Sequence, residues 1–233
     1  MSGFDIQQLL NTDRDLLLTM NGSESMFWDE VMQMITSTQT WIPFFVVLLY
    51  VILKNNSLKS FVWTIVSILL VIVICDRVSS GIFKPVFERF RPTQDPYIMY
   101  MVDIVNNYRG GQYGFISSHA ANTFGISIFL SLLIRKWSFS MMMFIWAILS
   151  SYSRIYLGVH YPGDILFGAL LGCLIGILMY WLYIAVNKRI DESCKYWVSN
   201  LYTCSGYLNS DINLLNITFL LIYAIIPIIG FLL

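Results

Sequence analysis

Charged side chains are scarce in this sequence, and neither sign of charge is in excess. Lys, Arg, Asp and Glu make up 12% of the 233 residues, about half the share that is typical of soluble domains. Basic and acidic residues number 14 each, so no net charge indicates a nucleic acid or another polyanion as partner. Hydrophobic residues make up 57%, and the mean hydropathy is +0.67. This composition excludes a disordered, collagen-like or disulfide-stapled chain and predicts a membrane protein.

Cysteine is also rare, and its positions carry no recognisable chemistry. The four cysteines form no CxxC pair and show no spacing typical of metal ligands. Cys75 and Cys173 lie in apolar runs and are predicted to be small buried hydrophobic residues. The sequence also contains no carboxylate cluster with metal-ligand spacing. We therefore expect neither a metal nor another cofactor.

Long runs without charge indicate where the chain crosses the membrane. A charge at the bilayer centre costs about 2.5–3.5 kcal/mol on insertion scales, and a spanning helix needs roughly 17–25 apolar residues. On this basis we predict an all-α integral membrane bundle of six helices. The spans are expected at residues 39–54, 60–78, 119–134, 139–157, 164–186 and 213–233.

Two amphipathic segments, residues 4–20 and 26–35, precede the first span, with a turn at residues 21–23. They either lie in the membrane interface or form a soluble helical cap over the bundle. The chain is predicted to be a single domain: N-terminal helices over 1–38, a five-span core over 39–186, and a loop with the sixth span over 187–233.

Basic residues gather in alternate loops, which predicts the orientation. Alternation places these loops on one side, and the positive-inside rule makes that side cytoplasmic. Both chain termini then face outward. The absence of a visible targeting signal and the compact size favour a bacterial inner membrane. The basic residues concerned are Lys54, Lys59, Arg135, Lys136, Lys188, Arg189 and Lys195.

Three polar segments, residues 84–92, 117–119 and 153–164, each lie at an outer end of a predicted span. A lone histidine in a helical protein is more often structural than catalytic, but the chain's only two, His119 and His160, both lie here. Histidine suits acid–base or nucleophilic work near neutral pH. Lys84, Arg91 and Arg154 would form a cationic pocket suited to phosphate oxygens.

The expected helix starts strengthen this interpretation. Pro162 suits the first position of a helix, which places His160 just before a helix N-terminus and Asp164 in its first turn. Ser117 or Ser118 is expected to cap a second helix. Two helix N-termini that point at one place would form an anion site.

The arrangement Lys-x6-Arg-Pro, Ser-x-His and Ser-Arg-x5-His-x3-Asp, from Lys84 to Asp164, resembles the type 2 phosphatidic acid phosphatase / haloperoxidase superfamily. All three motifs occur in the family's order, and their combination is highly specific. The second motif usually reads Pro-Ser-Gly-His, whereas Ile116 and Ser118 replace the Pro and Gly here. Ser118 would narrow the pocket or add a hydroxyl donor.

The resemblance implies a phosphohydrolase that works through a phosphohistidine, without a metal. His160 would attack phosphorus, Asp164 would orient it, and His119 would protonate the leaving oxygen and then activate water. The resemblance assigns the binding of the phosphoryl oxygens to Lys84, Arg91, Ser117, Ser118 and Arg154.

The site at a lipid–water boundary indicates a membrane-borne substrate, and the bilayer is the expected partner. The candidates are undecaprenyl diphosphate, phosphatidylglycerol phosphate, phosphatidic acid and a lipid A phosphate. The segment 93–115, rich in Tyr and Met, would either flank the substrate's chains or plug the bundle's outer end.

Two other functions compete with the phosphatase interpretation. The soluble vanadate-dependent haloperoxidases of the same superfamily conflict with six hydrophobic spans. A non-enzymatic transporter or binder of anionic lipids would explain buried Arg and Lys equally well. It would not explain why His160 and Asp164 occur in register with His119.

Overall fold

The computed structural model describes residues 6–190 and 200–232, and the predictions that involve Cys194 and Lys195 lie outside these residues. Apart from two isolated β-bridges, the regular structure of the described residues is helical. The α-helices are α1 (Ile6–Met20), α2 (Met26–Thr36), α3 (Ile42–Asn55), α4 (Leu58–Val78), α5 (Lys84–Phe87), α6 (Ser118–Ile134), α7 (Trp137–Tyr156), α8 (Pro162–Ile190) and α9 (Asn209–Leu232). A π-helical segment, Ser79–Phe83, joins α4 to α5.

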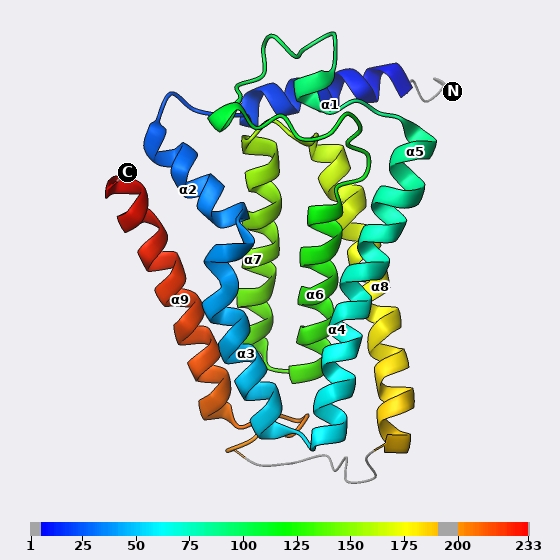
Figure 1. Ribbon diagram of the computed structural model, residues 1–233, viewed down its shortest axis with the longest axis vertical. Coiled ribbons are helices and arrows are strands. Elements are labelled where there is room, and N and C mark those ends of the chain that lie inside the picture. Colours follow the sequence, from blue (N-terminus) through cyan, green and yellow to red (C-terminus); the bar gives the residue numbers. More distant parts are fainter. Residues whose placement is uncertain (1–5, 191–199, 233) are drawn as a thin grey trace.

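The prediction of an all-α membrane bundle is confirmed, and a helix occupies each of the six expected positions (Figure 1). Four helical stretches are long and apolar enough to cross a membrane: Thr38–Asn55, Leu58–Phe87, Pro162–Ile190 and Asn209–Leu232. The shorter apolar helix α6 has 17 residues, and α7 contains five serines and Arg154.

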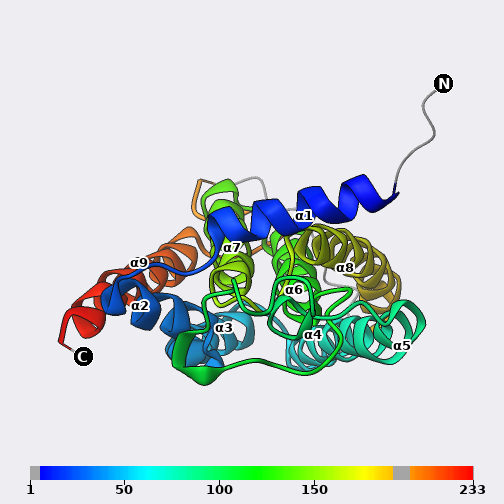
Figure 2. The ribbon, with the colours of Figure 1, turned by 90° about the horizontal axis from the view of Figure 1, so that it is seen from above.

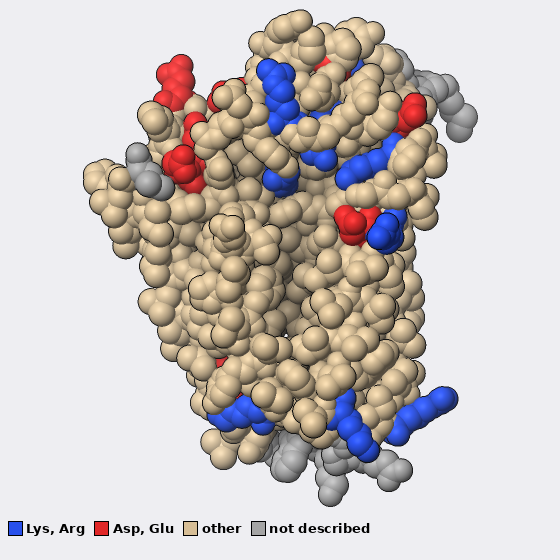
Figure 3. Space-filling model, in the orientation of Figure 1, with Lys and Arg blue, Asp and Glu red and all other residues tan. Residues whose placement is uncertain are grey.

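The bundle helices stand side by side, and α1 lies across one end of them (Figures 1 and 2). The C-terminal end of α9 reaches the same end, next to α2, while the α3–α4 and α6–α7 connections lie at the opposite end. This arrangement agrees with the alternation expected from the sequence. Figure 3 shows charged side chains gathered toward the two ends, with a belt almost free of charge between them.

Aromatic side chains fill the core between α3, α7 and α9. The ring centroids of Trp41 and Phe219 are 5.1 Å apart, and those of Phe44 and Phe219 are 4.9 Å apart. Trp146 of α7 meets Trp41 edge-on at 5.9 Å. Pairs of this kind contribute about 0.5–1.5 kcal/mol each beyond their buried area, so they fix the relative position of the three helices.

Glycines on α8 allow close packing against α6. A Cβ on Gly172 would lie 2.3 Å from the carbonyl oxygen of Ala121, and one on Gly168 would lie 2.5 Å from that of Ser117. Small residues at this spacing let membrane helices approach backbone to backbone. The contact matters for the site because α6 and α8 begin side by side at the end covered by α1 (Figure 1).

We expect Gly172→Ala to separate α6 from α8, because its Cβ clashes with backbone that cannot rotate away. Overpacking of this kind costs about 1–3 kcal/mol, or a Tm loss of roughly 2–12 °C. Thermal unfolding in detergent measures the effect. Gly111→Ala is the control, since nothing lies within 4 Å of a Cβ there. Equal Tm values for the two variants would contradict the close packing.

The N-terminal helix combines both of the roles considered for it. α1 caps the bundle, with Leu17 completely buried. Leu18 and Met20 are half-buried and pack against the same cluster, whereas Ile6 and Leu9 are open, with exposed fractions of 68% and 50%. Such a helix fits the boundary between the bundle's end and the lipid headgroups.

The connection between α5 and α6 fills the end of the bundle, which is one of the two roles considered for it, while contact with the substrate's chains stays a prediction. Ile98, Val102 and Val105 are buried and plug the end of the bundle. Tyr97 and Tyr100 are strongly exposed, which suits an interface between lipid and water.

Candidate active site

The three polar segments meet beneath α1, as the alternation of spans predicts. The α7–α8 turn is closed by the carbonyl oxygen of Arg154, which accepts hydrogen bonds from the amides of Val159 (3.1 Å) and His160 (3.3 Å). Gly158 supplies the left-handed conformation (φ +68°) that this reversal requires. The amide of Ser117 donates to the carbonyl oxygen of Asp164 at 3.1 Å, which ties the start of α6 to the first turn of α8.

His160 lies between a carboxylate and a guanidinium. Its Nδ1 is 3.4 Å from Oδ2 of Asp164, and its Nε2 is 3.4 Å from Nη1 of Arg91. Because a guanidinium can only donate, Nε2 is the accepting nitrogen and the ring proton belongs on Nδ1, facing Asp164. The Nε2 lone pair accepts this hydrogen bond in the structure, and it becomes free for attack when a bound anion draws the guanidinium to itself.

The surroundings of His160 keep its imidazole neutral. Burial lowers the pKa of His160 well below its usual range, and the positive charges of Arg91, Arg154 and Lys84 lower the pKa further. The neutral form is present above the pKa, so the ring is unprotonated at pH 7. A neutral ring nitrogen is the form that can attack phosphorus.

Lys84 is held at the junction of α4 and α6. Its Nζ donates to the hydroxyl of Ser118 at 3.0 Å and to that of Ser80 at 3.1 Å. Ser79 also donates to the Ser118 hydroxyl, at 2.7 Å. Ser118, which occupies the glycine position of the family motif, therefore anchors the lysine with its added hydroxyl.

His119 and Arg154 share a polar partner on α2. Nε2 of His119 is 2.9 Å from the hydroxyl of Ser150 and 3.5 Å from that of Thr36, to which Nη1 of Arg154 donates at 3.2 Å. Nη2 of Arg154 donates to the hydroxyl of Tyr108 at 3.3 Å, and this hydrogen bond lowers the pKa of the Tyr108 phenol.

One nitrogen of Arg154 has no protein partner. Its Nε is buried and makes no hydrogen bond among the described residues, and Arg154 as a whole is only 9% exposed. A buried guanidinium donor without a partner is costly, whereas an anion would satisfy it. This observation is the most direct sign in the fold of a site for a phosphoryl oxygen.

The predicted site residues thus lie at one end of the bundle, where hydrogen bonds and close contacts link them in three groups. His160, Asp164 and Arg91 form one group, Lys84 and Ser118 a second, and His119 and Arg154 a third. Ser117 differs from these, because it is fully buried and its hydroxyl caps α6 by accepting from the amide of Ala120 at 3.4 Å. Its contact with a substrate stays a prediction.

Sequence reasoning missed several side chains of the site. Arg89 donates to Oδ1 of Asp164 at 2.9 Å, and Asp13 of α1 accepts from Arg89 at 2.7 Å. Arg89 could have been noticed as a second guanidinium within the first motif. Asp13, Thr36 and Tyr108 had no local signal, because only the fold brings their segments to the site.

An apolar cavity of about 600 Å³ adjoins the site beneath α1. Asp13 and Arg89 are its charged lining residues, and Gly163 of α8 also faces it. The remaining lining is apolar and comes from α1, α5, α8 and the connection that precedes α6: Ile6, Leu9, Leu10, Leu16, Phe87, Phe115 and Phe167. No group of three or more His, Cys, Asp or Glu suited to a metal ion occurs in the described part of the chain.

Fold and site together define a helical membrane protein with a histidine-containing, cationic anion site at one end. Residues 60–188 match the model of the PAP2 superfamily. The chain is 40% identical over 189 residues to a lipid A 4'-phosphatase of Bacteroides thetaiotaomicron, covering 80% of this chain and 84% of that protein. It is 33% identical over 198 residues to a lipid A 4'-phosphatase of Porphyromonas gingivalis, covering 84% of each.

Two solved structures share the fold. A transmembrane PAP2-type phosphatidylglycerolphosphate phosphatase from Bacillus subtilis aligns with a TM-score of 0.58 at 20% identity, over 80% of this chain and 89% of that one. Aquifex aeolicus LpxE aligns with a TM-score of 0.52 at 24% identity, over 71% and 92%. The chain belongs to the PAP2 superfamily, and it is an integral membrane lipid phosphatase, a phosphoric ester hydrolase.

Proposed function

We propose that the protein hydrolyses a phosphate monoester on the sugar headgroup of a lipid A-type glycolipid, through a phosphohistidine on His160. The names of the two bacterial relatives at 40% and 33% identity support this substrate. The observation that carries the mechanism is the position of His160 between Asp164 and Arg91.

In the first step, Nε2 of His160 forms a bond to phosphorus while the bond from phosphorus to the lipid oxygen breaks. Asp164 stabilises the imidazolium through Nδ1. His119 acts in this step as an imidazolium, which the negative charge of the bound phosphate stabilises against the charge of Arg154. The departing alkoxide takes its proton, and Nε2 of His119 exchanges its contacts with Ser150 and Thr36 for the leaving oxygen. The products of this step are the lipid alcohol and the phosphoenzyme.

In the second step, water attacks phosphorus and its proton passes to His119, which is now neutral. The bond between phosphorus and Nε2 breaks, and its electron pair returns to His160. Inorganic phosphate leaves, and both histidines regain their starting states. Each step develops negative charge on the phosphoryl oxygens.

Cationic side chains stabilise that charge. Arg91 already faces Nε2, where phosphorus arrives, and Arg154 offers its buried, unpartnered Nε. Lys84 is held by Ser118 on the α6 side. Fixed donors of this kind stabilise a transition state without reorganising during the reaction. The apolar cavity beneath α1 suits an acyl chain of the substrate.

A panel of the four candidate lipids with purified protein in mixed micelles tests the substrate, with free phosphate as the readout. We expect the fastest release from bisphosphorylated lipid A, with mass spectrometry showing loss of the 4'-phosphate alone. Faster release from undecaprenyl diphosphate, phosphatidylglycerol phosphate or phosphatidic acid would contradict the substrate. Binding of anionic lipids with no phosphate release from any of them would favour a transporter instead.

We further propose that the site faces the periplasm of a bacterial inner membrane. The support is the set of basic residues at the opposite end, which includes Lys54 and Arg135.

A reporter that is active only in the cytoplasm tests this topology. We expect a signal when it is fused after Lys136, because the α6–α7 connection lies at the basic end, and none when it is fused after Leu233. A fusion after Lys188 is a second cytoplasmic control. The reverse pattern would place the site in the cytoplasm.

A further inference from the structure

The catalytic carboxylate has two oxygens with different partners. Oδ2 of Asp164 faces Nδ1 of His160 and accepts from the amide of Tyr161 at 3.1 Å. Oδ1 accepts from Nη1 of Arg89 at 2.9 Å, and the side chain of Asp164 is completely buried. Because a carboxylate is planar, a partner that fixes Oδ1 also fixes the direction in which Oδ2 points.

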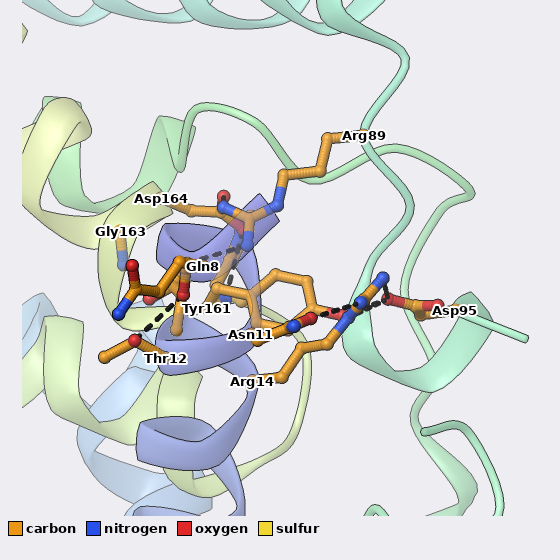
Figure 4. A network of polar contacts seen from close by, with 11 residues as sticks. Gln8, Asn11, Thr12, Arg14, Arg89, Asp95, Tyr161, Gly163 and Asp164 are labelled. Atoms are coloured by element: carbon orange, nitrogen blue, oxygen red, sulfur yellow. Dashed lines mark hydrogen bonds and ion pairs between the residues drawn. The ribbon is translucent and has the colours of Figure 1, made fainter. Parts of the chain in front are cut away.

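Arg89 is in turn held by the N-terminal helix. Its Nη2 donates to Oδ2 of Asp13 at 2.7 Å, and Oδ1 of Asp13 accepts from the amide of Gly163 at 2.8 Å. The guanidinium also lies over the ring of Tyr161, 4.0 Å from its centroid. Figure 4 shows Arg89 beside Asp164 and Tyr161. Asp13 therefore joins Arg89 to the first turn of α8, next to Asp164.

A second contact from α1 reaches the residue that follows the nucleophile. Nε and Nη2 of Arg14 both donate to Oδ2 of Asp95 at 3.1 Å (Figure 4). The same oxygen accepts from the hydroxyl of Tyr161 at 2.7 Å. Two consecutive residues of α1 thus reach the surroundings of His160. Asp13 holds Asp164 through Arg89. Arg14 holds Tyr161 through Asp95.

We propose that Asp13 and Arg89 are positioning residues, which hold Asp164 in the orientation that aims His160 at phosphorus, so that α1 is a working part of the catalytic centre. The inference rests on the proposed phosphohistidine mechanism. Neither residue needs to touch the substrate's phosphate, because both act through Asp164. Breaking the pair should therefore lower kcat and leave KM nearly unchanged.

The test compares four single variants with wild type on the lipid substrate, together with the double variant Asp13→Asn/Arg89→Gln and with His160→Ala. Asp13→Asn keeps the size of the side chain and the oxygen that accepts from Gly163, but loses the charge that faces Arg89. Arg89→Gln removes the guanidinium, and Arg89→Lys keeps its charge without the two-pronged geometry. The control is Asp15→Asn, an exposed carboxylate on the same helix.

We expect kcat to fall by about 10- to 100-fold in Asp13→Asn and Arg89→Gln, the size of effect seen when a metal-ligating side chain loses the partner that orients it. KM should change less than about twofold, and Arg89→Lys should recover part of the rate. The rate of phosphoenzyme formation should fall with kcat. Asp13→Asn should have no further effect in the Arg89→Gln background, because the two residues act as one unit.

Two results would overturn the proposal. One is that Asp13→Asn and both Arg89 variants match Asp15→Asn in kcat while His160→Ala is inactive. The other is a raised KM with an unchanged kcat, which would make Arg89 a substrate contact. If Arg89→Gln does not fold, Asp13→Asn and Arg89→Lys decide by the same criteria. An active His160→Ala enzyme would instead refute the proposed function.

Discussion

His160→Ala is expected to abolish turnover and the covalent phosphoenzyme together. The variant loses the nitrogen that lies 3.4 Å from Arg91 and is kept neutral by burial and by the surrounding cations. Loss of the nucleophile costs on the order of 10⁶-fold in kcat in serine proteases, so activity should fall below detection. Rapid acid quench of enzyme turning over labelled substrate measures the phosphoenzyme directly.

The control for this experiment separates lost chemistry from lost structure. Asp15→Asn, on the exposed side of α1, should form phosphoenzyme at the wild-type rate. Thermal unfolding of His160→Ala is measured alongside, because the loss of a buried side chain lowers the Tm by some degrees while a cooperative transition shows that the variant is folded. Label on the His160→Ala protein, or no label on wild type during turnover, would refute the assignment of the nucleophile.

The bundle could be predicted from the sequence because each span is determined by its own residues. Each span is a run in which charge is avoided over the thickness of a bilayer, and this property needs no knowledge of neighbouring helices. Alternation then determines which ends meet. The same logic places His119 and His160 at one end although 40 residues separate them, and the structure has them at the adjoining starts of α6 and α8.

The support of the site could not be predicted in this way. Asp13 reaches Arg89 from a helix that lies across the bundle, and Thr36 reaches Arg154 from α2. Neither contact follows from spacing, because each depends on how the amphipathic helices pack against the bundle. The close approach of α6 and α8 was missed for another reason. Gly168 and Gly172 lie in an apolar run, and such a run predicts a membrane span but not which helix packs against it.

Ser118 shows how the structure narrows an alternative that the sequence leaves open. A side chain in place of the motif's glycine could have narrowed the pocket or added a hydroxyl. The hydroxyl contacts Nζ of Lys84 at 3.0 Å and the hydroxyls of Ser79 and Ser80. It therefore acts on the lysine that is proposed to bind phosphate.

His119→Ala should give a slow enzyme rather than a dead one. In the proposed mechanism His119 supplies the proton for the leaving oxygen, and general acid–base catalysis is worth about 10²–10⁴-fold. His160, Asp164 and Arg91 keep their mutual contacts in this variant, so the phosphoryl group can still be transferred to Nε2. Steady-state phosphate release and the amount of quenched phosphoenzyme are measured on the same preparation.

The leaving group distinguishes the two histidines most sharply. A nitrophenolate needs little protonation as it departs, so nitrophenyl phosphate should restore phosphoenzyme formation in His119→Ala but not in His160→Ala. Hydrolysis of the intermediate should stay slow in His119→Ala, because water still lacks its base, and labelled phosphoenzyme should accumulate. The rate of Asp164→Asn should fall between those of the two histidine variants. Nδ1 of His160 keeps a polar neighbour in this variant, but the negative charge of that neighbour is lost. If the substrate change rescued both histidine variants equally, neither residue could be the nucleophile.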